Sequence, residues 1–464
     1  MFHSISRSAA TTRRTGLLAL GLSTLLAMLA GSMANLVLPA LGAAFAVPFA
    51  SLQWVLVAYL LGITCLTLVA GRLGDRLGRR RLLLAGTALF MLASLLCALA
   101  PSMGWLIAAR ALQGAGAACM LSLALAMVGP LVPADRRGWG MGLLGTLSAC
   151  GTALGPSMGG LLVENLGWQA PFLLLVPLGL LALVAGMIGL PVDEQEQEGE
   201  GINPGSLLAL TSALLCYGLL LSAGSEYGYG LVPVGGLAAW LLVRSERHAS
   251  APLLPLTLLH EPALRGGLLG SALVASVMVL TLLIGPFYLC GVFGLSLTEV
   301  GLWLSGGPLL AACTGLPAGW LVDRLGAGAV VRLGLGTMLI AMLGLVTSPI
   351  SWGPLGYLLP ILLLTAGYAL FQTANNGAVV GAASEQHRGA VAGLLTLARN
   401  LGQLTGAAGL GGLFAALVGG DNLGDASAAA LRSGMQLSFA LAGLLIGLSL
   451  WVAGVQTRRA LALD

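Results

Sequence analysis

The sequence predicts an all-α polytopic membrane protein. Of its 464 residues, 58% are hydrophobic and only 8% are charged, whereas a soluble domain carries about 25% charged residues. The apolar residues form continuous runs separated by short polar loops, and a run of roughly 20 residues is long enough to cross a bilayer as a helix. Because these runs do not alternate between apolar and polar residues, they do not fit a transmembrane β-barrel.

The first half of the chain predicts six membrane-spanning helices. An apolar run from Gly16 to Pro39 follows three arginines, as in a secretory signal, but many more spans come after it, so we expect a retained first helix. The next apolar runs cover residues 52–70, 82–100, 105–128, 138–163 and 171–190. Together these six runs predict one helix bundle.

Two polar linkers interrupt the apolar pattern. The acidic run at 193–200 and the charged, proline-rich segment at 244–261 are typical of solvated linkers. Between them lie two shorter apolar runs, at 207–223 and 231–243. Six further runs follow, at 268–292, 300–321, 330–347, 355–380, 390–417 and 437–455. The expected total is fourteen transmembrane helices, in the order six, two, six.

The charge distribution predicts the orientation of the chain. All 21 basic residues are arginines, and placing the N-terminus inside leaves only Arg432 among the loop arginines outside. By the positive-inside rule both termini are then cytoplasmic, and we expect the cytoplasmic (inner) membrane of a bacterium. The expected divisions are a cytoplasmic N-terminal segment (1–15), an N-terminal bundle (16–190), a linker with two extra helices (191–261), a C-terminal bundle (262–456) and a cytoplasmic tail (457–464).

One charged loop occurs twice, each time after the second helix of a bundle. Ala-Gly-Arg-Leu-Gly-Asp-Arg-Leu-Gly at 70–78 resembles Ala-Gly-Trp-Leu-Val-Asp-Arg-Leu-Gly at 318–326. Such a repeat predicts two parallel halves with a substrate site between them, near the middle of the membrane. Its glycines permit a tight turn, and its charges can form a latch on the cytoplasmic side; the alternative is that they only set the topology. The candidate gate residues are Gly71, Asp75, Arg76, Gly78, Arg79, Arg80, Asp323 and Arg324.

Two motifs connect the chain to a known family. The loop from Gly71 to Arg81 is similar to the cytoplasmic loop motif of the major facilitator superfamily, Gly-x-Leu-x-Asp-Arg-x-Gly-Arg-Arg. Arg110 and Gln113 lie in an Arg-x-x-Gln-Gly-x-Gly pattern that resembles a second motif, whose arginine is implicated in proton transfer. An arginine inside a membrane helix costs about 2.5–3.5 kcal/mol or more and normally faces a cavity or a partner. We therefore expect a coupling role for this pair; the alternative is that Arg110 snorkels to the outer surface.

The fifth span resembles the Gly-x8-Gly-x3-Gly-Pro-x2-Gly-Gly motif of the superfamily's exporters. Small residues at these intervals permit close helix packing, and the proline permits a bend. Generic small-residue packing is the alternative. The residues of this motif are Gly142, Gly151, Gly155, Pro156, Gly159 and Gly160. Segments 35–39 and 53–61 resemble the fourteen-helix drug:proton antiporter (multidrug efflux) family, so the resemblance covers nearly the whole chain and implies the major facilitator fold.

One departure from that family concerns the proton carrier. The membrane aspartate of the family's first-helix motif falls on Ala30, and no acidic residue lies deep in any predicted span. A buried carboxylate suits proton coupling because its charge can change as it faces alternate sides. Antiport is therefore implied by the resemblance, whereas the proton carrier is not identified.

Several polar and aromatic residues are candidates for the substrate cavity. Arg399 and Gln403 are four residues apart and so share a helix face. Amides at this depth need partners, which are either neighbouring helices or substrate. We expect Arg399 to act in coupling or substrate binding, and packing is the alternative for the aromatic residues. The candidate lining residues are Asn35, Trp54, Tyr59, Gln372, Asn375, Asn376 and Gln403.

The expected function is secondary active export of small amphipathic compounds or drugs by alternating access, with proton antiport implied. An uncoupled or differently coupled metabolite or anion facilitator is the alternative. A membrane-embedded enzyme or sensor is a weaker one, because the four histidines are scattered and no Gly-x4-Gly-Lys-Ser/Thr phosphate loop occurs. The seven cysteines are isolated, so we expect no metal site and no cofactor. Small molecules, protons and the lipid bilayer are the expected partners, without nucleic acid, and a monomer is favoured.

Overall fold

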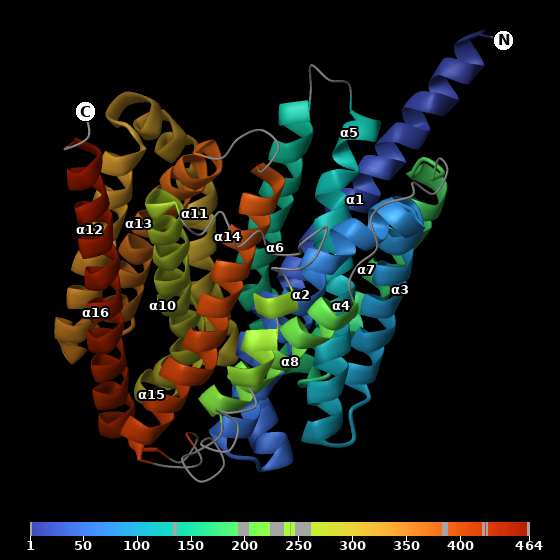
Figure 1. The fold of residues 1–464 in the computed structure, drawn as a ribbon. Helices are drawn as coiled ribbons and strands as arrows, with labels where there is room; N and C mark the ends of the chain where they lie inside the picture. Colours follow the sequence, from blue (N-terminus) through green and yellow to red (C-terminus); the bar gives the residue numbers. More distant parts are fainter. Residues whose placement is uncertain are drawn as a thin grey trace.

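The structure, a computed structural model, is helical throughout its described part (Figure 1). The described residues are 2–132, 137–193, 204–222, 236–241, 243–245, 261–382, 388–419, 423 and 426–461. Across these ranges the chain forms helices and turns without a β-strand. The all-α prediction is confirmed.

The first bundle is formed by long helices with short turns. Its helices are α1 (Phe2–Phe45), α2 (Phe49–Leu77), α3 (Arg79–Ala98), α4 (Met103–Ala126), the short α5 (Val128–Leu131), α6 (Arg137–Leu166) and α7 (Ala170–Gly189). The first helix starts at Phe2, so most of the predicted N-terminal segment 1–15 continues that helix. The polar residues of this segment did not end the helix, because it contains neither proline nor glycine to interrupt helical hydrogen bonding.

The rest of the chain adds a linker helix and the second bundle. The helices are α8 (Pro204–Ser222), α10 (Pro262–Phe293), α11 (Leu297–Leu325), α12 (Ala327–Thr347), the 3₁₀ turn η3 (Ile350–Trp352), α13 (Leu355–Gly381), α14 (Arg388–Leu404), the π-helical η5 (Thr405–Leu410), α15 (Gly411–Val418) and α16 (Ala428–Leu461). α11 begins with a capping box, in which Ser296 and Glu299 exchange side-chain to backbone hydrogen bonds.

The number of spans differs from the predicted fourteen. Within the described residues, ten helices are long and apolar enough to cross a membrane, or eleven if the bent α11 is one span. The glycine-rich α6 is outside this count, although it packs between α1 and α11. Of the predicted span at 231–243, residues 236–241 and 243 are described, and they are helical but belong to a helix shorter than a full span. The count of fourteen therefore stays a prediction.

The repeated loop has the same backbone geometry in both bundles. α2 ends at Leu77 and α11 ends at Leu325, and each is followed by a glycine with positive φ, Gly78 at 96° and Gly326 at 79°. A residue with a side chain is strained at such φ values, so glycine permits the immediate start of the next helix. The sequence repeat thus corresponds to a structural repeat of two helix–turn–helix units.

The two bundles share an apolar core on one side of the membrane. Both chain ends lie at one face of the molecule, which we call the terminal face, and the α1–α2 turn lies at the opposite, distal face (Figure 1). Near the distal face, Phe49 of α2 contacts Phe287 of α10 edge to face, with ring centroids 5.2 Å apart. Phe414 of α15 also packs on the Phe49 ring. Residues of both bundles form one continuous buried cluster there.

The linker helix α8 lies against the seam between the bundles. Its residues Leu210 and Leu214 belong to a buried cluster that includes Val57 of α2 and Leu404 of α14. Tyr217 of α8 forms a hydrogen bond of 2.5 Å with Thr405, the first residue of the π-helical segment. The linker therefore contributes a side wall to the molecule.

Candidate functional site

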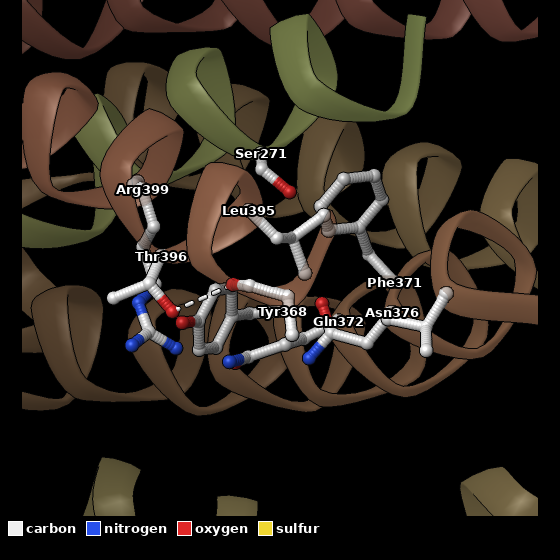
Figure 2. Close-up of a pocket in the computed structure, with 11 residues that line it drawn as sticks. Ser271, Tyr368, Phe371, Gln372, Asn376, Leu395, Thr396 and Arg399 are labelled. Atoms are coloured by element: carbon white, nitrogen blue, oxygen red, sulfur yellow. Dashed lines mark hydrogen bonds between the residues drawn. The ribbon is translucent and has the colours of Figure 1, made fainter. Parts of the chain in front are cut away.

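A cavity in the second bundle is the candidate substrate site. Its volume is about 180 Å³, and α10, α13 and α14 form its wall (Figure 2). A guanidinium, two amides and three hydroxyl groups share this wall with apolar side chains. The lining residues are Ser271, Ala275, Tyr368, Phe371, Gln372, Asn376, Val380, Ala392, Leu395, Thr396 and Arg399.

The polar part of the wall comes from two helix faces. On α13, Tyr368, Gln372 and Asn376 recur every four residues and so form one stripe along the helix. On α14, Thr396 and Arg399 are three residues apart and share a face. The side chains of Arg399, Gln372 and Asn376 point to the same side of the two helices (Figure 2). The sequence already shows this spacing of four residues, which could have identified Tyr368 as a lining residue.

The structure places the predicted lining residues in different surroundings. Gln372, Asn376 and Arg399 line one cavity. Asn375 instead is buried and joins α13 to α10, because its amide donates hydrogen bonds to Gly267 O (3.1 Å) and Ser271 Oγ (2.9 Å). Gln403, one turn beyond Arg399, is half-buried and lies outside the lining of this cavity.

The predicted lining residues of the first bundle lie away from this cavity. The Tyr59 hydroxyl donates to Ala27 O at 2.6 Å, which ties α2 to α1. The Asn35 amide donates back to Gly31 O and Ser32 O within α1. Trp54 is half-buried and packs beside α8. All three therefore make contacts within their own bundle or with the linker helix.

Arg110 is the centre of a buried network in the first bundle. The side chain is fully buried, so it does not snorkel to the surface. Its Nε donates to Val55 O at 3.0 Å, and its Nη1 bonds Gln113 Oε1 and approaches Ala30 O at 3.4 Å. The guanidinium carbon lies 4.2 Å from the centre of the Tyr59 ring, in cation–π contact.

The network leaves one donor of Arg110 unused. Gln113 continues it by donating to Ser94 Oγ at 2.7 Å. Arg110 Nη2 is buried and has no hydrogen-bond partner among the described residues. Carbonyls, an amide and an aromatic ring therefore surround the charge, beside Ala30, the position at which the resemblance in sequence led us to expect an aspartate. Arg110 thus joins α4 to α1 and α2, and Gln113 extends the network to α3, without a carboxylate among these contacts.

The exporter motif makes α6 a contact helix for both bundles. Methyl groups added at Gly151 and Gly155 would collide with Leu25 O and Ser32 of α1. A methyl at Gly160, on another face, would collide with Leu297 O of α11. In contrast, Gly142 faces open space. Glycines thus permit backbone contact between α6 and α11 across the bundle boundary.

Hydrogen bonds reinforce this contact near the distal face. Ser157 N, one residue after Pro156, donates to Ser305 Oγ of α11 at 3.1 Å. Glu164, at the end of α6, accepts the Thr298 N–H at 2.8 Å and so caps the first turn of α11. Hydrogen bonds from the side chain and the backbone of Thr298 hold the pKa of Glu164 below its ordinary value. The distal face is therefore closed by contacts between the two bundles.

The basic loop on the terminal face makes contacts within its own bundle. Arg79 Nη1 reaches Ala126 O at the end of α4 (3.4 Å), and Arg80 Nη2 donates to Met187 O near the end of α7 (2.6 Å). Helix ends of this kind favour positive charge. The side chain of Asp75 lies outside the described part of the structure. A latch between bundles involving this residue therefore stays a prediction.

Asp193 is the first residue of the acidic run predicted to be a solvated linker, but the structure gives it a role that the sequence did not indicate. Its carboxylate accepts the N–H groups of Arg80 (2.9 Å) and Arg81 (3.1 Å), so it caps the start of α3. In the second copy of the loop, Asp323 and Arg324 are exposed, and the Arg324 guanidinium lies 4.1 Å from the centre of the Trp320 ring. The sequence shows a carboxylate shortly after α7, but it does not show that this carboxylate caps α3, because the two segments are far apart in the chain.

Comparisons with known proteins agree with this architecture. The sequence model of the Major Facilitator Superfamily matches residues 20–407. The uncharacterized transporter YebQ of Escherichia coli is 32% identical over 391 residues, 82% of this chain and 85% of that protein. The tetracenomycin C resistance and export protein of Streptomyces glaucescens is 30% identical, over 87% of this chain and 76% of its own length.

Another relative and a solved structure extend these comparisons. The riboflavin transporter RibZ of Clostridioides difficile is 29% identical, over 83% of this chain and 84% of its own. A bacterial homolog of the human lysosomal transporter Spinster, crystallised in an inward-facing and unoccupied conformation, has a TM-score of 0.71 at 16% identity, covering 96% of this chain and 97% of that one. The enzyme alternative is thereby set aside. The chain belongs to the Major Facilitator Superfamily and is a membrane transporter that resembles drug efflux proteins.

Proposed function

We propose that this transporter exports small amphipathic compounds by alternating access. The observation that carries the proposal is that α6 and α11 are in backbone contact near the distal face, while a polar cavity lies between α10, α13 and α14. Cargo would bind in this cavity and leave when the α6–α11 contact opens. The exporter motif on α6 and the similarity to the tetracenomycin C resistance and export protein support the outward direction.

The proposed membrane orientation has the terminal face in the bacterial cytoplasm. The arginine distribution supports it, because the basic loop from Arg76 to Arg81 lies at that face and positive loops stay inside. The repeated loop would then act as the cytoplasmic gate during the rocking of the two bundles. A monomer contains both bundles and is the proposed working unit.

Proton antiport is the proposed energy source, by resemblance to the drug:proton antiporters. Arg110 and Gln113 lie in the motif implicated in that coupling, but the Ala30 position lacks the aspartate. Arg110 would then act by exchanging its Gln113 and carbonyl contacts as the bundle moves. An uncoupled facilitator remains the alternative.

Two measurements test the function. A panel of toxic compounds is applied to cells that lack or overexpress the transporter, and export predicts that overexpression raises the tolerated concentration of at least one amphipathic compound. Everted membrane vesicles with an acidic interior are then given that compound. Proton antiport predicts that a pH-sensitive dye reports loss of the gradient on addition. No change in tolerance for any compound would contradict export, and transport with an unchanged gradient would favour the uncoupled alternative.

A further inference from the structure

Arg399 introduces a positive charge into a cavity whose described wall has no acidic residue. The eleven lining residues contain one arginine and no aspartate or glutamate. The described carboxylates in the chain lie instead at helix ends, away from the middle of α14. They are Glu164, Asp193, Glu261, Glu299 and Asp323. Nothing on this wall neutralises the guanidinium.

A half-buried guanidinium within a bundle is stabilised by a negative partner. Charge inside a membrane protein is costly, and it normally pairs with an opposite charge or faces a site that is filled by one. Arginine is suited to this because its planar donor groups match the two oxygens of a carboxylate, and such charge-assisted hydrogen bonds are stronger than neutral ones. Arg110 has its neighbours within the first bundle, whereas Arg399 is directed to the cavity.

The other lining residues suit the remainder of an organic anion. The amides of Gln372 and Asn376 and the Tyr368 hydroxyl offer hydrogen bonds along the α13 stripe. The Phe371 and Tyr368 rings and Leu395 provide an apolar surface beside them. An inorganic ion would leave that surface unused, and a cation would be repelled by Arg399.

We propose that the cavity binds amphipathic organic anions, with Arg399 recognising a carboxylate or similar group and the aromatic wall holding a planar apolar body. This inference rests on the proposed transport function and names its substrate class. Arg399 is then the residue that determines selection between an acid and its neutral analogue. Transport of multiply charged cations is disfavoured at the same site.

The test compares two probes that differ only in charge. The full chain is placed in nanodiscs of zwitterionic lipid, and binding of radiolabelled 1-naphthoate and of its neutral amide, 1-naphthamide, is measured at pH 7. We expect the anion to bind about tenfold or more tightly than the amide, the size of one charge-assisted hydrogen bond. An equal affinity for both probes, or no binding of naphthoate, would overturn the proposal.

Three variants assign the preference to Arg399. Arg399→Gln should abolish the difference between the two probes, and Arg399→Lys should keep part of it, because the charge remains although the paired planar donors are lost. Arg265→Gln is the matched control, since that arginine is exposed near the start of α10 and lies outside the cavity lining. It should behave as the wild type. The lysine variant keeps the test valid if the glutamine variant fails to fold, because a lost preference in Arg399→Lys with normal folding would also contradict the proposal.

The outcome is separable from that of the proposed function. If cells export a compound but Arg399→Gln keeps the preference for naphthoate, the result supports export and contradicts the proposed anion site. If the preference depends on Arg399 while no compound is exported, the result supports the anion site and contradicts the proposed direction or cargo of transport.

Discussion

Arg110 shows how one residue can be identified by sequence and understood only through its contacts. An arginine in a predicted span had to be buried against a partner or reach the surface. The structure buries it against Val55 O, Ala30 O, Gln113 and the Tyr59 ring. Helix periodicity places Gln113 beside Arg110 on α4, but no sequence rule gives the partners on α1 and α2, because the packing of these helices is decided by the whole bundle.

A Gln113→Leu substitution should destabilise the protein. It removes the acceptor of Arg110 Nη1 and the donor to Ser94 Oγ, and it leaves a buried charge less satisfied. A buried polar group without its partner costs about 1–3 kcal/mol, more when it is charged. Thermal unfolding of the purified protein measures the change, with Gln403→Leu as a control because Gln403 is half-buried. An unchanged midpoint would show that the network contributes no stability.

Asp193 illustrates a helix cap supplied from a distant part of the chain. An Asp193→Ala substitution leaves the N–H groups of Arg80 and Arg81 without their acceptor, and we expect a loss of about 0.5–2 kcal/mol, typical of a missing cap. Asp193→Asn keeps one of the two acceptor oxygens and should retain part of that stability. Chemical or thermal unfolding checks both variants, and equal loss in the two would indicate that charge rather than capping matters.

At the scale of elements, α6 is the helix that packs against both bundles. Its glycines were predicted to permit close packing, and the structure separates their roles: Gly151 and Gly155 face α1, Gly160 faces α11, and Gly142 faces open space. The motif spacing predicts a smooth face but cannot say which neighbour occupies it. Only the arrangement of the two bundles decides that.

A comparison of Gly160→Val with Gly142→Val separates the effect of the α6–α11 contact from the effect of merely replacing a motif glycine. Valine at 160 would collide with Leu297 O and oppose distal closure, so efflux should fall by about tenfold or more, as expected from an overpacking cost of about 1–3 kcal/mol. A Cβ at 142 meets no heavy atom within 4 Å, so valine there should leave efflux near the wild-type rate. Vesicle transport at matched protein levels provides the measurement. Equal rates in both variants would contradict a role for the α6–α11 contact.

At the scale of the whole molecule, one of the contacts that close the distal face is made by a titratable group, Glu164. Glu164 has a pKa lowered by its hydrogen bonds to Thr298, so its ionised form favours the closed distal face. This contribution is fully present above the ordinary pKa of glutamate. It is lost as the pH falls through the lowered value.

Glu164→Gln should therefore loosen the start of α11 at neutral pH. Hydrogen exchange of the Thr298 amide, corrected for the intrinsic rate, is expected to rise in the variant, and acidification of the wild type through the lowered pKa should approach the same value. Glu299→Gln is the matched control, because that carboxylate caps its own helix through Ser296 N. If both variants exchange alike, the link between bundles does not protect the turn.

The sequence by itself determined the class of the protein. Apolar runs of helix length, the loop repeated at 70–78 and 318–326, and the motifs around Arg110 and Pro156 are local patterns, and they were sufficient for the all-α fold and the superfamily. They also marked Arg399, Gln372 and Asn376 as polar residues within spans, because such residues stand out against apolar neighbours.

Only the tertiary structure decided which of those residues meet. It put Gln372, Asn376 and Arg399 on one cavity, turned Asn375 towards Ser271, enclosed Arg110 in its own bundle and brought Asp193 to the start of α3. Helix periodicity tells which residues of one helix share a face, but not which helix that face meets. The facing partner follows from how the helices pack, and this depends on contacts between segments that are far apart in the chain.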